Sequence, residues 1–198
     1  MVPQFFADKR PHNGMNYKEY IQRVINDVAV TSLDALTTEE KEYIEYKKLN
    51  LQRSSRIERT YTVSEELEQL IKNINNKQIW MVLTEGWCGD SAQILPHIVK
   101  MAELNPNIDL RILLRDSNPD IMDLYLTNGT RSIPRLIAFD SEGNEIFNYG
   151  PRPKALQALI TQWKSEGIVK PELYEKLHLW YARNKGKEIE AEFIKILS

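Results

Sequence analysis

The residues that could do chemistry gather around Cys88, the only cysteine of the 198-residue chain. It lies between a short apolar run at 78–84, typical of a buried strand, and a stretch at 91–104 whose apolar residues recur at helical spacing. Unpaired amides and the helix dipole favour a thiolate at such a junction, and Gly89 lets the backbone approach closely. Asp90 opposes this, because a nearby carboxylate disfavours a second negative charge. We expect an accessible thiol, and the sign of its pKa shift stays open.

Other candidate groups are few. Ser91, three positions after Cys88, is either the N-cap of the helix or a partner for the sulfur. His97 lies nine residues beyond Cys88, about 13 Å along a helix, which is too far for a Cys–His pair. His12 and His178 have no ligand-spaced partners, so the sequence predicts neither a metal site nor a cofactor.

The elements that must position Cys88 follow an alternating order. Apolar runs predict four strands, at 78–84, 108–115, 134–139 and 145–149. Helical spacing and helix-start signals predict helices at 17–28, 37–51, 64–71, 91–104, 118–126, 153–163 and 169–197, the last broken near 184–186. A strand–helix–strand order implies a parallel pair, and the last two strands read as an antiparallel hairpin. The sequence therefore predicts an α/β fold with a mixed sheet of about four strands flanked by helices.

The segment Trp87-Cys88-Gly89-Asp90-Ser91 resembles the Trp-Cys-Gly-Pro-Cys active site of the thioredoxin family, with serine in place of the second cysteine. Pro96 lies where thioredoxins carry the proline of the active-site helix. Ser132-Ile133-Pro134 resembles the element whose cis-proline lies against the nucleophilic sulfur. The resemblance covers residues 61–166. It implies a thioredoxin-like domain there, an N-terminal helical extension at 1–60 and a C-terminal helical extension at 167–198 packed on the core.

More narrowly, four motifs together resemble a bacterial thioredoxin-like subfamily with helical extensions: Trp-Cys-Gly-Asp, Leu113-Leu-Arg-Asp116, Ser-Ile-Pro and Gly150-Pro-Arg-Pro153. The resemblance implies a redox role for Cys88 and Ser91 as catalytic residues. It also implies a substrate groove formed by Trp87, Gly89, Asp90, Ile133, Pro134 and Arg135.

Two departures from the family pattern bear on mechanism. Ser91 cannot resolve a mixed disulfide, because an alkoxide is a poor attacking or leaving group at sulfur. The buried acid that assists the second cysteine in thioredoxins is replaced here by Val82. The Cys-x-x-Ser site therefore implies monothiol exchange, in which an external thiol resolves the adduct.

Three arginines are candidates to shape the site. Arg115 ends the second predicted strand and Arg135 follows Pro134, so either guanidinium could lie within about 4–6 Å of the sulfur and favour the thiolate. Arg152 is expected to line the groove or to pair with Asp116.

Two alternatives remain beside monothiol exchange. The first is a non-catalytic thioredoxin-fold adaptor that binds a protein partner through its groove and extensions. The second resembles the monothiol glutaredoxins, whose Cys-Gly-Phe-Ser site binds glutathione and an iron–sulfur cluster. The segment 148–152 does not resemble their glycine-rich Cys-Asp segment, and Asp90 replaces their aromatic residue, which ranks this alternative last.

The amino-acid composition restricts the classes of molecule that the protein is expected to bind. The net charge is −2, and basic residues are spread among acidic ones, so no nucleic-acid footprint is visible. No run of eighteen apolar residues predicts a membrane span, and the first ten residues have no continuous apolar run. With a single cysteine, these features predict a cytoplasmic protein whose partner is a protein or a low-molecular-weight thiol or disulfide. The oligomeric state and the substrate stay open.

Overall fold

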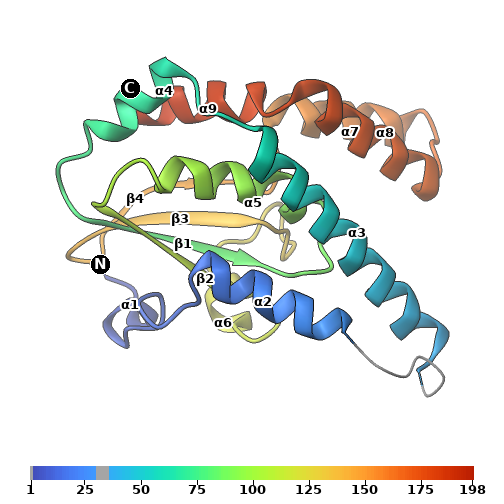
Figure 1. The fold of residues 1–198 in the computed structure, drawn as a ribbon, viewed down its shortest axis with the longest axis horizontal. Coiled ribbons are helices and arrows are strands. Elements are labelled where there is room, and N and C mark those ends of the chain that lie inside the picture. Colours follow the sequence, from blue (N-terminus) through green and yellow to red (C-terminus); the bar gives the residue numbers. More distant parts are fainter. Residues whose placement is uncertain (1, 30–35) are drawn as a thin grey trace.

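The centre of the molecule is a four-stranded mixed sheet (Figure 1). The computed structural model describes residues 2–29 and 36–198, so residue 1 and residues 30–35 of the predicted N-terminal extension lie outside the described residues. The strands are β1 (Gln78–Thr84), β2 (Ile108–Leu114), β3 (Arg135–Asp140) and β4 (Glu145–Tyr149), in the order β2-β1-β3-β4. β1 and β2 are parallel, whereas β3 is antiparallel to both of its neighbours. This confirms the predicted mixed sheet of an α/β, thioredoxin-like fold.

The inner strand β1 is apolar because both of its faces are covered. Trp80 and Val82 point into one core, and Met81 and Leu83 into another on the opposite face, as the period of two of a strand requires. All four side chains are fully buried. A strand covered on both sides carries no polar face, which is why its bounds could be read from the sequence.

The helices within the described residues are, in chain order, α1 (Gln4–Ala7), α2 (Tyr17–Val28), α3 (Thr38–Thr60), α4 (Glu65–Lys72), α5 (Gly89–Ala102), α6 (Pro119–Met122), α7 (Lys154–Ser165), α8 (Lys170–Asn184) and α9 (Lys187–Leu197). In Figure 1, α5, α7, α8 and α9 lie above the sheet, and α1 and α6 lie below it. The helices of both predicted extensions therefore lie around the sheet.

Both long N-terminal helices begin at a capping box. Thr37 accepts the Glu40 amide and Glu40 accepts the Thr37 amide, so α3 begins where the sequence predicted. Asn16 and Glu19 form the same reciprocal pair at the start of α2. These caps set the starts of α2 and α3, the two helices that lie beside Cys88.

The C-terminal helices contribute side chains to the main core. α8 buries Leu173, Leu177 and Tyr181, and α9 buries Ile189 and Phe193 beside Trp80. The chain turns between them at Lys185 and Gly186, both with positive φ. A Cβ on Gly186 would lie 2.4 Å from Nε2 of His97, so this corner needs glycine for its backbone angle and for its close approach to α5.

Two local predictions differ from the structure. The helix predicted at 118–126 is only the four-residue α6, because Leu124 and Leu126 stay exposed and give no packing energy to extend it. The short helix α1 was not predicted. Its Phe5 and Phe6 pack edge-on or tilted against Phe139 and cover the lower face of the sheet.

Candidate functional site

Cys88 lies at the junction between β1 and α5. It is the N-cap of α5, a role that the sequence had left open for Ser91, and its Sγ accepts the Ser91 backbone N–H at 3.5 Å. The thiol donates to the Ile133 carbonyl at 3.4 Å, and the Ile133–Pro134 peptide bond is cis. The structure thus brings Cys88 and Ser91, at the start of α5, together with Ile133 and Pro134 from the segment before β3.

The Cys88 side chain is buried, with 8% of the residue exposed, so the expectation of an accessible thiol is wrong for this conformation. Burial raises the pKa of the Cys88 thiol, and the Asp90 carboxylate raises it further. The Ser91 hydroxyl and the amides of Asp90 and Ser91 offset this only in part. At neutral pH the sulfur is therefore a thiol, not the thiolate that attacks disulfides.

The N-terminal extension covers one side of the sulfur. Asn50 of α3 donates to the Gly86 carbonyl at 3.1 Å, and Ser54 donates to the Ala92 carbonyl at 3.2 Å. Tyr20 of α2 helps to line a cavity of about 10 Å³ beside Cys88, room for a single water molecule. The buried Ser91 hydroxyl finds no hydrogen-bond partner of standard geometry in the part of the chain that the structure describes.

The C-terminal extension packs against the start of α5, next to Cys88, through α8. A Cβ on Gly89 would lie 2.9 Å from Cε1 of His178, so a side chain at position 89 would force the His178 ring to move. Gln93 contacts Nδ1 of His178 at 3.3 Å. Burial, with Arg53 nearby, lowers the pKa of His178 to about 4, so the ring against Gly89 is neutral at neutral pH.

Asp90 joins α8 to the site through a buried network of Asp90, Arg152 and Tyr181, the Asp90 network from here on. Arg152 Nε donates to Asp90 Oδ2 at 2.8 Å, and the Tyr181 hydroxyl donates to Asp90 Oδ1 at 2.8 Å. Arg152 thus pairs with Asp90, and its expected pairing with Asp116 is wrong. Tyr181 is a site residue that sequence reasoning missed, because its ring fits the apolar stripe of its helix.

The other two arginines are engaged away from the sulfur, which corrects the expectation that they favour the thiolate. Arg115 lies 4.7 Å from the centre of the Trp87 ring and pairs with Asp116. Arg135 donates to the Gly150 carbonyl at 2.6 Å and to Asn148. Neither guanidinium is among the groups that lower the pKa of the Cys88 thiol, so neither offsets Asp90.

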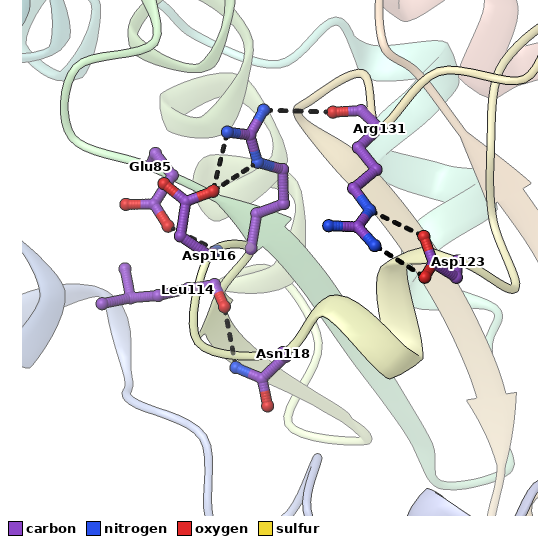
Figure 2. A network of polar contacts seen from close by, with 7 residues as sticks. Glu85, Leu114, Asp116, Asn118, Asp123 and Arg131 are labelled. Carbon is purple, nitrogen blue, oxygen red and sulfur yellow. Dashed lines mark hydrogen bonds and ion pairs between the residues drawn. The ribbon is translucent and has the colours of Figure 1, made fainter.

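A second, more exposed polar network holds the segment before Pro134 (Figure 2). Arg115 donates to the Arg131 carbonyl at 3.2 Å, and the Arg131 side chain makes two bonds of 2.7 Å to Asp123. The Asp116 amide donates to Glu85 at 2.9 Å, and burial raises the pKa of the Glu85 carboxyl. Trp87 and the Ile133 segment are therefore tied to the same end of the sheet.

Residues 2–29 and 36–198 contain no group of three or more His, Cys, Asp or Glu side chains arranged to hold a metal ion. Nor do they contain a helix that is both long and apolar enough to cross a membrane.

Comparisons with known proteins agree with this fold. A family model described as thioredoxin matches residues 37–164, a match that begins within the N-terminal extension predicted at 1–60. A Pseudomonas aeruginosa protein of unknown function, PA1234, superposes with a TM-score of 0.58 at 18% identity, over 94% of this chain and 93% of its own. An HIV epitope-scaffold superposes with a TM-score of 0.57 at 17% identity, over 94% of each chain. No curated protein matches. The two structures show the fold, and the family match shows that this chain belongs to the thioredoxin family.

Proposed function

We propose that the protein is a monothiol thioredoxin-like exchange protein acting through Cys88. One observation carries the proposal: the sulfur lies at the N-terminus of α5. There it accepts a hydrogen bond from the Ser91 amide and donates one to the Ile133 carbonyl, which precedes the cis-proline Pro134. This arrangement supports attack on a disulfide, because the helix N-terminus stabilises the negative charge on the Cys88 sulfur. It does so both when Cys88 attacks as a thiolate and when it leaves a mixed disulfide as one.

The proposed reaction has two steps. The Cys88 thiolate attacks one sulfur of a substrate disulfide, a new S–S bond forms, and the other substrate sulfur leaves as a thiolate. An external thiolate then attacks the mixed disulfide, and Cys88 leaves as the thiolate. Ser91 takes no electrons in either step, so the outside thiol is the reductant. A reducing compartment such as the cytoplasm would supply that thiol, in agreement with the localisation expected from the sequence.

The burial of Cys88 determines the expected rate of thiol–disulfide exchange. Because the Cys88 side chain is buried beside α2 and α3 and its pKa is raised, attack requires both deprotonation and opening of these packed helices. We therefore expect slow exchange that accelerates with pH and with anything that loosens the cover.

The test is the alkylation rate of Cys88 by iodoacetamide between pH 6 and 11, with the same protein in urea as the exposed reference. We expect the native protein to react more slowly than the reference, with a pH midpoint above the ordinary range of cysteine. Alkylation should outpace global unfolding, which hydrogen exchange measures independently. A rate limited by global unfolding at every pH would refute exchange through Cys88.

The burial of Cys88 also favours a second candidate, the non-catalytic adaptor. In this case the thiol is packing, and a protein partner binds without a covalent bond. Purification of the wild type and of Cys88→Ser, both without reductant, separates the two functions. Adducts that disappear in Cys88→Ser and on reduction support exchange, whereas partners retained by both proteins support the adaptor.

A further inference from the structure

A groove of about 530 Å³ lies where the C-terminal extension meets the thioredoxin-like domain, between α7, α8 and the start of α9. Its lining consists of Trp163, Lys176, Leu179, Trp180, Arg183, Asn184 and Lys187, called the tryptophan groove from here on. None of these residues belongs to the Asp90 network or contacts Cys88. The volume falls within the range of pockets that hold small organic ligands.

The walls of the groove are aromatic. Trp163 comes from α7 and Trp180 from α8, both are half-buried, and Leu179 is 48% exposed. α8 already buries Leu173, Leu177 and Tyr181 in the core through another face. Trp163 and Trp180 therefore pack against the main core with one part of their surface and line the groove with another, while Leu179 stays outside the core.

The charges of the groove have one sign. Lys176, Arg183 and Lys187 line it, and no carboxylate among the described residues does. The Lys176 Nζ atom lies 3.6 Å from Oε1 of Glu172 and 5.9 Å from the centre of the Trp163 ring. Arg183 and Lys187 form no ion pair with any residue in the described ranges. The groove is therefore electrostatically complementary to an anion.

We propose that the tryptophan groove binds a small planar aromatic carboxylate. The ring of the ligand stacks on Trp163 and Trp180, and its carboxylate meets Arg183 and Lys187. Aromatic faces provide offset stacking, and a guanidinium binds a carboxylate through two parallel hydrogen bonds. This site does not depend on the proposed function of Cys88.

The test uses probes that share one ring system and differ in charge, 2-naphthoate and 2-naphthylmethylamine. The indole N–H resonances of the four tryptophans report where each probe binds, after assignment with Trp163→Phe and Trp180→Phe. We expect 2-naphthoate to shift the Trp163 and Trp180 resonances saturably and to leave Trp80 and Trp87 unchanged. The amine should bind at least tenfold more weakly, because it meets three cations.

Charge variants provide the control. Arg183→Gln/Lys187→Gln should weaken 2-naphthoate binding roughly tenfold. Lys77→Gln/Lys195→Gln removes the same charge from exposed positions outside the groove and should leave binding unchanged. Equal losses in both variants, equal binding of both probes, or shifts centred on Trp87 would overturn the proposal. So would burial of Trp163 and Trp180 in a dimer without any probe, which would assign the groove to a second copy of the chain.

Discussion

Two arginine–carboxylate pairs flank the Cys88 region, and they differ in burial more than in chemistry. In the Asp90 network the Asp90 side chain is 8% exposed and that of Arg152 is 25% exposed, whereas Asp123 and Arg131 are 48% and 51% exposed. The first pair joins α5, the segment after β4 and, through Tyr181, α8. The second joins positions eight residues apart. The same pair of groups is therefore part of the core at one place and of a solvated loop at the other.

The largest effect should follow from Asp90→Ala. This change leaves the Arg152 guanidinium without its carboxylate and the Tyr181 hydroxyl without its acceptor, which should lower the free energy of unfolding by about 3 kcal/mol. Urea denaturation followed by circular dichroism measures it. A loss no greater than that of an exposed substitution would show that the network does not hold α8 in place.

Gly89→Ala comes next and tests the fit of α8 against the site. The added Cβ would lie 2.9 Å from His178, so we expect a loss of about 2 kcal/mol and faster alkylation of Cys88 as α8 shifts outward. His178→Ala in the same chain should restore part of both values. If the double variant lost as much unfolding free energy as the two single variants together, the added methyl group would not clash with His178.

Tyr181→Phe removes only the hydroxyl and keeps the buried ring. Loss of one buried hydrogen bond to a charged group should cost about 1.5 kcal/mol, less than Asp90→Ala because Arg152 still pairs with Asp90. The urea midpoint of Tyr181→Phe should lie between those of the wild type and Asp90→Ala. A loss equal to that of Asp90→Ala would mean that the hydroxyl, and not the ion pair, carries the network.

Asp123→Ala should have the smallest effect, because both members of this pair are solvated and screened. We expect a urea midpoint within error of the wild type, with Cys88 alkylation unchanged. A loss comparable to that of Asp90→Ala would remove the contrast between the two pairs.

The sheet was predictable because its strands follow local rules. The apolar runs at 78–84 and 145–149 coincide with β1 and β4, and the convergence of Cys88 with Pro134 followed from the resemblance. The bounds of the thioredoxin-like domain and the roles of the site residues stay predictions.

The burial of the thiol could not be predicted, because it depends on how helices distant in sequence, α2 and α3, pack beside Cys88. One signal was available. The hydroxyl of a buried tyrosine usually has a hydrogen-bond partner, so Tyr181 pointed to a buried acceptor that the sequence did not name. Arg152 was expected at the substrate groove near Cys88, but its partner depended on the direction of its side chain, which sequence spacing does not fix.

The position of Phe193 has a consequence for synthesis of the chain on the ribosome. Its ring packs against Trp80, Phe147 and Tyr149, so the part of the sheet around these three side chains lacks its cover until α9 has been synthesised. Contacts this distant in sequence form late in folding. The nascent protein therefore exposes these aromatic side chains to solvent until α9 packs on them.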